Sequence, residues 1–124
     1  MKELVERVLE NLSTRDVFLF RIRCGVCGEE HESHATRFSK AGLAPQTAEK
    51  AVLFDAIYEQ EYRVARQNAV RNAAEQVNWC PLCKKLVCNR CFMICEDLDM
   101  CRDCADRLGQ TGYSVLHDVV DAAG

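Results

Sequence analysis

The sequence predicts a single small α+β domain, and three features of the chain lead to this. A chain of 124 residues is long enough for one compact domain and too short for two ordinary ones. It contains both a strand-like segment and a long segment free of glycine and proline. Its nine cysteines far exceed ordinary usage, so the fold should depend on disulfides or on bound metal.

Residues 1–12 should form a short amphipathic helix, because leucine and valine recur there at spacings of three and four. Residues 17–23 are rich in β-branched and aromatic side chains and then alternate apolar with charged, which is typical of a strand. Residues 32–39 should return beside it, with Gly28 available for the turn. The expected result is a hairpin over residues 17–39 that carries the first cysteine pair.

Residues 45–77 should form one long helix. Pro45 suits a first helical turn, where its missing N–H costs nothing, and no further glycine or proline precedes residue 77. Acidic residues come early and arginines late, in the order that the helix dipole favours. A helix of about 33 residues would be about 50 Å long, which is more than a small core can cover.

One face of this helix carries an apolar stripe that becomes richer in small residues toward its end. The stripe consists of Phe54, Ile57, Tyr58, Tyr62, Ala65, Ala69, Ala73 and Val77. Small side chains allow close approach of helices, so one interpretation is a homodimer formed through this helix. The other is packing against the N-terminal helix and the cysteine-rich core. Both can hold at once.

Eight of the nine cysteines form four Cys-x-x-Cys pairs, and Cys95 stands alone. The pairs are Cys24/Cys27, Cys80/Cys83, Cys88/Cys91 and Cys101/Cys104. Two intervening residues allow a tight turn to aim both sulfurs at one ion, and two such turns complete the Cys₄ shell of structural zinc. The sequence therefore predicts a zinc-stabilised fold with two Zn²⁺ ions. Most of the ligands lie in a cysteine-rich module over residues 79–108, followed by a loosely packed tail at 109–124.

The cellular setting also favours metal over disulfides. Residues 1–15 carry several charged side chains and lack the apolar core of a secretion signal. No apolar run approaches the roughly 20 residues of a membrane-spanning helix. We therefore expect a cytoplasmic protein without a membrane partner, in a compartment where disulfides do not persist.

The first two pairs resemble the knuckles of rubredoxins and zinc ribbons. Their sequences are Cys24-Gly-Val-Cys27-Gly and Cys80-Pro-Leu-Cys83-Lys. Iron and zinc share the same four-sulfur geometry, so iron is the alternative metal. If pairs that are neighbours in sequence combine, these two knuckles close one site as a zinc ribbon, and the third and fourth pairs close the other.

A second resemblance begins at the second pair. The order Cys80-Pro-Leu-Cys83, Cys88-Asn-Arg-Cys91 and Cys101-Arg-Asp-Cys104 is similar to the ligand spacing of FYVE domains, and PHD fingers have a similar rhythm. In such cross-brace, treble-clef zinc fingers the first and third pairs share one ion and the second and fourth share the other. The resemblance implies Cys24/Cys27 with Cys88/Cys91, and Cys80/Cys83 with Cys101/Cys104.

This resemblance concerns the scaffold and not the ligand. FYVE domains carry a basic, histidine-containing stretch before the second pair, where this chain has residues 74–79 without a basic side chain. PHD fingers usually have histidine where this chain has Cys88. Neither phosphoinositide binding nor histone-tail binding carries over to this chain.

Several other residues invite a functional interpretation. His31 and His34 could close a zinc site with Cys24 and Cys27, but this would strand six paired cysteines, so surface histidines are the simpler interpretation. His117 has no nucleophile beside it and should be exposed.

Two apolar residues near the cysteine pairs also have two interpretations each. Cys95 should be a small buried side chain, with a reactive thiol as the alternative. Trp79 should pack over a zinc site, with an exposed surface for stacking bases as the alternative.

Charge is distributed unevenly along the chain, whose formal net charge is -3. Residues 63–91 carry six basic side chains against the single acid Glu75, whereas residues 92–124 carry seven acids against two bases. These blocks either neutralise each other in the fold or leave a basic face for nucleic acid. Eight thiolates on two Zn²⁺ ions would make the net charge more negative, which argues against a general polyanion-binding surface.

No three-ligand metal site with an open position, nucleophile with a base, or phosphate-binding loop is evident in the sequence. We therefore predict a non-enzymatic protein in which two structural Zn²⁺ ions scaffold a protein-interaction module. A nucleic-acid-binding zinc ribbon and a rubredoxin-like iron electron-transfer protein are the alternatives.

Overall fold

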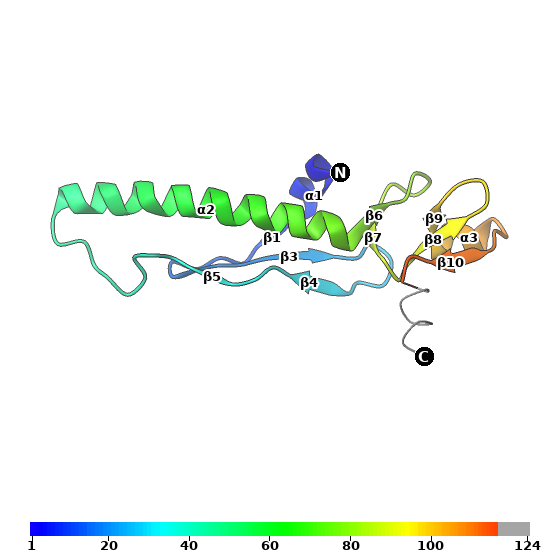
Figure 1. The fold of residues 1–124 in the computed structure, drawn as a ribbon, viewed down its shortest axis with the longest axis horizontal. Coiled ribbons are helices and arrows are strands. Elements are labelled where there is room, and N and C mark those ends of the chain that lie inside the picture. Colours follow the sequence, from blue (N-terminus) through cyan, green and yellow to red (C-terminus); the bar gives the residue numbers. More distant parts are fainter. Residues whose placement is uncertain (117–124) are drawn as a thin grey trace.

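A computed structural model describes residues 1–116 of the chain. The molecule is elongated, with a long helix lying along a layer of short strands and a cysteine-rich part at one end (Figure 1). The N-terminal half contains α1 (Lys2–Val8), β1 (Glu10–Asn11), β2 (Val17–Phe18), β3 (Phe20–Arg23), β4 (Glu30–Glu32), β5 (Thr36–Arg37) and α2 (Ala48–Gln76). The C-terminal half contains β6 (Val77–Trp79), β7 (Leu86–Cys88), β8 (Phe92–Cys95), β9 (Met100–Cys101), α3 (Arg102–Arg107) and β10 (Gly112–Ser114). The predicted mixed fold with one long helix is confirmed.

The strand layer departs in detail from the single hairpin predicted over residues 17–39. β3 pairs antiparallel with both β1 and β4, while β2 pairs separately with β5. The returning chain therefore begins at Glu30 and forms two short strands, whereas one continuous strand was predicted over 32–39. Ser33 explains the break, because its Oγ accepts a hydrogen bond from the Phe20 N–H and takes the place of a ladder partner.

One face of the strand layer is apolar and the other is charged, as the alternation of apolar and charged residues in β3 requires. Phe18, Phe20 and Ile22 are buried on one face, each only 1% exposed. On the other face Arg21 bridges Glu10 at 2.6 Å and Glu30 at 3.0 Å, which ties β1, β3 and β4 together.

Helix α2 is shorter than the predicted 45–77 and begins at Ala48. Thr47 is its N-cap, and the Thr47 side chain accepts a hydrogen bond from the Lys50 N–H at 3.1 Å. The hydrogen bond from the Lys50 N–H, a free N–H of the first turn, to the Thr47 hydroxyl stabilises a helix start at Ala48 more than Pro45 stabilises an earlier start. Pro45 therefore remains in the preceding loop. The helix ends at Gln76 because Val77 adopts an extended backbone and starts β6.

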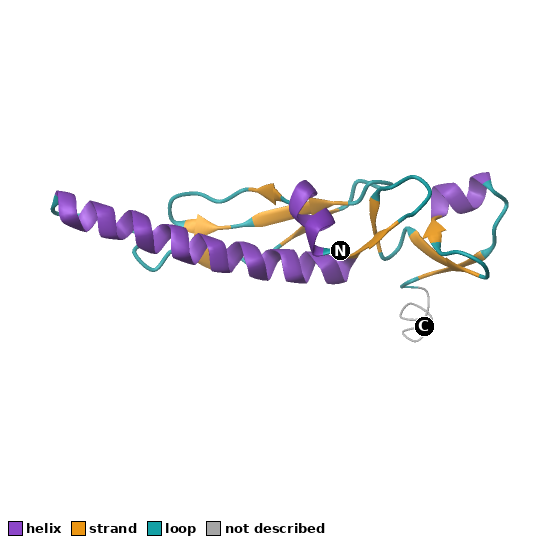
Figure 2. Cartoon of the chain, turned by 90° about the horizontal axis from the view of Figure 1, so that it is seen from above, coloured by secondary structure: helices purple, strands orange, loops and turns teal. Residues whose placement is uncertain are grey.

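The apolar stripe of α2 packs inside the molecule. Toward its N-terminal end, Tyr58 and Tyr62 pack with tilted or edge-on rings against Phe18 of the strand layer, and the ring centroids of Phe18 and Tyr58 are 5.0 Å apart. Toward its C-terminal end, Val70, Ala73 and Val77 pack with Val5 of α1 and Ile22 of β3. The stripe therefore packs against the N-terminal helix, as predicted, but its other partner is the strand layer and not the cysteine-rich core (Figure 2).

The cysteine-rich half consists of two small antiparallel sheets and the short helix α3. β6 and β7 form a hairpin directly after α2, and β8 lies between β9 and β10 in a small antiparallel sheet. The predicted loose tail at 109–124 instead begins with β10, in which Gly112 lies opposite Cys95. A Cβ on Gly112 would stand 2.2 Å from the Ile94 carbonyl oxygen, so only glycine permits this pairing. His117 lies outside the described residues. Among residues 1–116, no helix has both the length and the apolar character needed to cross a membrane.

The aromatic packing under α2 gives a first test. Phe18→Ala should lower the free energy of unfolding by about 3 to 5 kcal/mol, because it empties a fully buried site between two tyrosines and Phe38. Phe54→Ala, at a half-buried position of the apolar stripe of α2, is the matched control and should lower the free energy of unfolding by about 1 kcal/mol. Chemical denaturation of the two variants measures both values, and equal losses would contradict this packing.

Candidate metal centres

The first two cysteine pairs adopt the same local backbone structure, which we call knuckle 1 (residues 24–29) and knuckle 2 (residues 80–85). In knuckle 1 the Cys24 N–H donates to the Glu29 carbonyl at 2.9 Å and the Gly28 N–H donates to the Cys24 carbonyl at 3.1 Å. In knuckle 2 the Cys80 N–H donates to the Lys85 carbonyl at 3.0 Å and the Lys84 N–H to the Cys80 carbonyl at 2.8 Å. The two turns therefore present their sulfur pairs in the same way.

Each knuckle reverses direction at a residue with a left-handed backbone. Gly28 has a φ of 75°, and Lys84 holds the equivalent position with a φ of 59°. Glycine adopts this conformation freely, whereas a residue with a Cβ pays roughly 1 to 2 kcal/mol for it. The conformation of Lys84 thus has a cost that the rest of the fold must offset.

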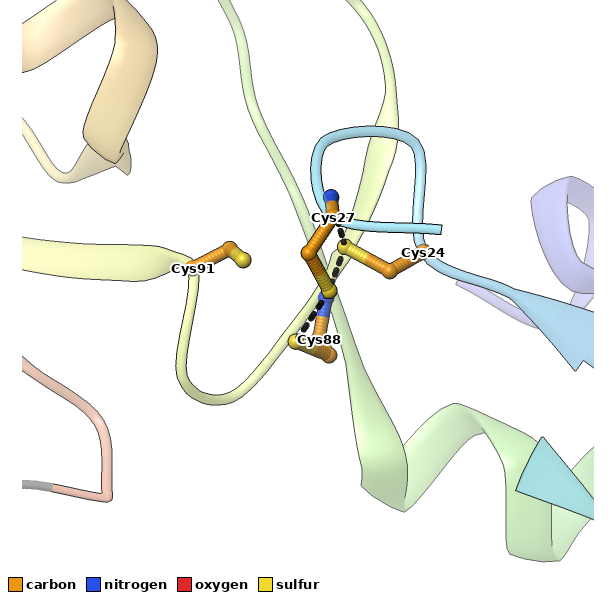
Figure 3. A group of neighbouring side chains, drawn as sticks. All are labelled: Cys24, Cys27, Cys88 and Cys91. Atoms are coloured by element: carbon orange, nitrogen blue, oxygen red, sulfur yellow. Dashed lines mark hydrogen bonds between the residues drawn. The ribbon is translucent and has the colours of Figure 1, made fainter. Parts of the chain in front are cut away.

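Knuckle 1 meets the third cysteine pair to form the first group, Cys24, Cys27, Cys88 and Cys91 (Figure 3). The knuckle follows β3, whereas Cys88 ends β7 and Cys91 lies in the turn that leads to β8. The Sγ atoms of Cys27 and Cys88 lie 3.8 Å apart, although 61 positions separate these residues in the sequence. This group therefore joins the strand layer to the cysteine-rich half.

Knuckle 2 meets the fourth pair to form the second group, Cys80, Cys83, Cys101 and Cys104. Cys101 is the N-cap residue of α3, and Cys104 lies within that helix. The sulfur atoms of Cys80 and Cys104 are 3.9 Å apart, and those of Cys83 and Cys101 are 3.7 Å apart. This group fixes α3 and β9 against the second knuckle.

These distances match a tetrahedron of sulfurs around one metal ion. Four sulfurs at about 2.3 Å from a central zinc lie about 3.8 Å from one another, and within each group all four sulfurs lie within 4.8 Å of one another. A disulfide would bring two sulfurs to about 2.05 Å, which no pair approaches. Each group can thus hold one metal ion in a closed Cys₄ shell, a geometry that zinc and iron share.

Backbone N–H groups favour the thiolate at one cysteine of each group. The Cys88 N–H donates to Cys24 Sγ at 3.2 Å, and the Val26 and Cys27 N–H groups also point at this sulfur. Burial alone raises the pKa of Cys24, but these donors outweigh it and lower the pKa to about 6.

Cys80 is the equivalent residue of the second group. Burial again raises its pKa, and N–H groups of Cys101, Cys83 and Leu82 outweigh this effect and lower the pKa to about 6. The two knuckles therefore each prepare one thiolate ligand by the same means.

In each group, burial also raises the pKa of some of the other thiols, which makes them harder to ionise. Burial raises the pKa of Cys101 to about 12, and the neighbouring thiols of Cys104 and Cys83 add to this. Burial likewise raises the pKa of Cys91, with further contributions from Cys88 and Cys27. Four converging thiolates repel one another, so a divalent cation at the centre is what would allow all four to ionise.

Two arginines support the groups from outside. Arg107 donates from Nη2 to Cys104 Sγ at 3.2 Å, which places a positive charge beside the second group. Arg90, between the two cysteines of the third pair, bridges Glu29 of knuckle 1 at 3.1 Å. The Arg90 to Glu29 ion pair therefore connects the same two parts of the molecule as the first cysteine group, namely knuckle 1 and the cysteine-rich half.

The two knuckles also touch directly. The Gly25 N–H donates to the Leu86 carbonyl at 2.9 Å. A Cβ on Gly25 would lie 3.0 Å from the Lys85 Cβ and 3.1 Å from the Leu86 oxygen. Glycine at position 25 therefore allows knuckle 1 to lie against the chain that leaves knuckle 2.

No protein-family model, curated protein or solved structure matches this chain. The assignment of the two centres rests on their own geometry.

All eight cysteines predicted as ligands lie in the two groups, and Cys95 lies outside both. The grouping is the cross-brace arrangement that the FYVE-like spacing implied. The sequential grouping, in which the two knuckles would share one ion as in a zinc ribbon, is not the one adopted. The sequence left the grouping of the pairs open because it depends on where the end of α2 places the second knuckle in the fold.

The alternative site that combined Cys24 and Cys27 with two histidines is not formed, since the sulfurs of the third pair complete that group. His31 lies opposite Ile22 in the β3–β4 ladder, and its Nε2 is buried without a hydrogen-bond partner among the described residues. His31 is thus half-buried on the hairpin, whereas His34 is exposed as predicted.

The burial of Cys95 is confirmed, at 9% exposure. The prediction for Trp79 is wrong, because this side chain packs beside Val5, Ile22 and Leu86 and not in the cluster that contains the cysteines. Val26, Met93, Ile94 and Val115 pack around that cluster instead. The contacts of Arg90 and Arg107 beside the cysteine groups were not predicted, although their positions within one cysteine pair and just after another were a usable signal.

The join between the knuckles gives a second test. Gly25→Asn should lower the free energy of unfolding by about 1 to 3 kcal/mol, because its side chain forces the Leu86 strand and knuckle 1 apart. Gly28→Asn is the matched control and should cost well under about 1 kcal/mol, because asparagine tolerates the left-handed backbone and no atom lies within 4 Å of its Cβ. Equal losses in chemical denaturation would argue against a tight join.

Metal content gives a third test. Cys88→Ala should reduce the bound metal from two equivalents to one, because it removes one ligand from the first group and none from the second. Cys95→Ala is the matched control and should keep both equivalents. Elemental analysis of the purified proteins measures both. A full complement of metal in the Cys88 variant would contradict the grouping.

Proposed function

We propose that this protein is a non-enzymatic interaction module held together by two structural Zn²⁺ ions. The observation that carries the proposal is the closure of both centres, in which four cysteine sulfurs surround each ion position. Catalytic zinc usually has three protein ligands and a water molecule, which a complete Cys₄ shell does not accommodate. Among residues 1–116, these two groups are the only clusters of three or more metal-ligating side chains.

The scaffold proposed is a cross-brace zinc finger of the treble-clef type. Knuckle 2 and the N-terminal turn of α3 contribute the four ligands of the second group, and the two groups interleave along the chain. Zinc is the proposed metal because it holds structural Cys₄ sites without redox chemistry. Each closed structural site contributes an apparent binding free energy of about 10 to 16 kcal/mol, against about 5 to 15 kcal/mol for a whole ordinary domain.

The alternatives derived from the first two knuckles receive less support. A zinc ribbon or a rubredoxin-like centre would require these knuckles to share one ion, and they belong to different groups. A protein partner is therefore proposed in preference to nucleic acid. A homodimer through α2 stays a prediction, since Val52, Leu53 and Val64 of this helix are exposed, at 68%, 53% and 57%.

Metal removal tests this proposal. Protein purified in its native form should be colourless and contain two equivalents of zinc. Treatment with a strong chelator should lower the melting temperature by tens of degrees, because the zinc contribution to folding is lost. A coloured protein that contains iron would favour electron transfer. An unchanged melting temperature after verified removal of both ions would refute the scaffold role.

A further inference from the structure

The two knuckles and α1 enclose a groove that neither cysteine group uses. It has a volume of about 370 Å³, and we call it the α1 groove. One side is formed by α1, and the other by the end of β3, Gly25 of knuckle 1 and the chain around knuckle 2. Because the contact between Gly25 and Leu86 closes one wall, the groove exists only while the two halves of the molecule are joined.

The floor of the groove is apolar and mostly aliphatic. Leu4 and Val8 of α1 line it together with Trp79 and Leu86. Val8 is 48% exposed, whereas Leu86 is 7% exposed, so the apolar floor becomes deeper from Val8 toward Leu86. Trp79 is half-buried among the aliphatic side chains of the neighbouring core cluster. A groove of this size and lining accommodates one apolar side chain of a partner, as anchoring pockets at protein interfaces do.

The rim of the groove is entirely basic. Arg7, Arg23, Lys84 and Lys85 line it, and no acidic residue does. The chain as a whole has 19 acidic against 16 basic residues, so such a concentration of positive charge is local. Arg23 is paired with Glu30 at 3.0 Å. The other three are exposed, have no ion-pair partner within the described part of the chain, and remain available to an anion.

We propose that the α1 groove docks an acidic segment of a partner protein through one aliphatic anchor side chain. The anchor would enter between α1 and Trp79, and flanking Asp or Glu residues would pair with the basic rim. This inference deepens the proposed interaction function by assigning its site and the chemistry of its partner.

The lining favours a protein segment over nucleic acid. Stacking of bases requires an exposed aromatic face, and Trp79 lies partly within the core. Three unpaired cationic side chains beside an aliphatic floor complement a peptide that has a few acidic residues and one apolar side chain. A polyphosphate could pair with the cations, but Leu4 and Val8 would add nothing to its binding energy. The excess of acidic residues in the chain also disfavours polyanions.

Fluorescence anisotropy with labelled probes tests the proposal on the full-length, metal-loaded protein. The main probe is a short peptide with one central leucine flanked by Asp and Glu. Three matched probes replace the leucine by alanine, replace the acids by lysines, or consist of oligothymidine. The acidic leucine peptide should bind, and its affinity should fall as salt is added. The alanine peptide should bind roughly tenfold more weakly or worse, because the anchor is lost.

Variants of the protein locate the binding. The double variant Arg7→Glu/Lys85→Glu should weaken binding of the acidic peptide about tenfold or more, because it reverses two charges of the rim. Val8→Asp should have a similar effect, because it places a carboxylate at the apolar floor. Lys50→Glu is the matched control and should bind as the unaltered protein does. Lys50 lies in the first turn of α2, at the opposite end of the molecule from the cysteine groups (Figure 1).

Several results would overturn the docking proposal. These are absence of binding by the acidic peptide, equal binding of the leucine and alanine peptides, equal weakening by Lys50→Glu, and tighter binding of oligothymidine. Metal content and melting temperature are measured on the same samples. A folded protein with two zinc ions that binds no peptide refutes the α1 groove alone, whereas a folded protein without zinc refutes the scaffold.

Discussion

The rest of the structure depends on the meeting of knuckle 1 with the third cysteine pair. Cys24 and Cys27 end the strand layer, and Cys88 and Cys91 belong to the cysteine-rich half, so this group connects segments that lie far apart in the sequence. The Gly25 to Leu86 hydrogen bond and the Arg90 to Glu29 ion pair span the same join. Val77 and Leu86 also pack with Val5 and Ile22 across this join. An exposed ion pair contributes little by itself, and one hydrogen bond contributes about 1 kcal/mol, so a metal ion held by the four sulfurs would add far more to the join than these two polar contacts do.

The two halves of the molecule are stabilised in different ways. The long helix and the strand layer bury an ordinary apolar core of aromatic and aliphatic side chains, with Phe18, Phe20 and Ile22 facing the stripe of α2. The cysteine-rich half has short strands, a six-residue helix and a core in which cysteines predominate. Burial raises the pKa of Cys91 and Cys101 within this core, so a bound cation would stabilise it in a way that the aromatic core does not need.

The sequence was sufficient to predict the parts that depend on local chemistry. The spacing of the eight cysteines was enough to identify all members of the two groups, because two intervening residues bring both sulfurs of a pair to the same side of the chain, in a knuckle or at the start of a helix. Alternation over 17–23 and the absence of glycine and proline after residue 45 identified the strand and the long helix. What could not be predicted depends on distant contacts: the grouping of the pairs, the pairing of β10 with β8, and the position of Trp79 beside α1. The start of α2 was misplaced for a local reason, because the Thr47 cap was overlooked in favour of Pro45.

The central claim is that each ion is enclosed by four sulfurs drawn from two distant pairs. X-ray absorption at the zinc edge, measured on natively purified protein, tests this most directly. The account predicts an average shell of four sulfur atoms at about 2.3 Å and no nitrogen or oxygen neighbour. A shell that contains histidine nitrogen or water oxygen at about 2.0 to 2.1 Å, or an absorption edge of iron in place of zinc, would contradict it.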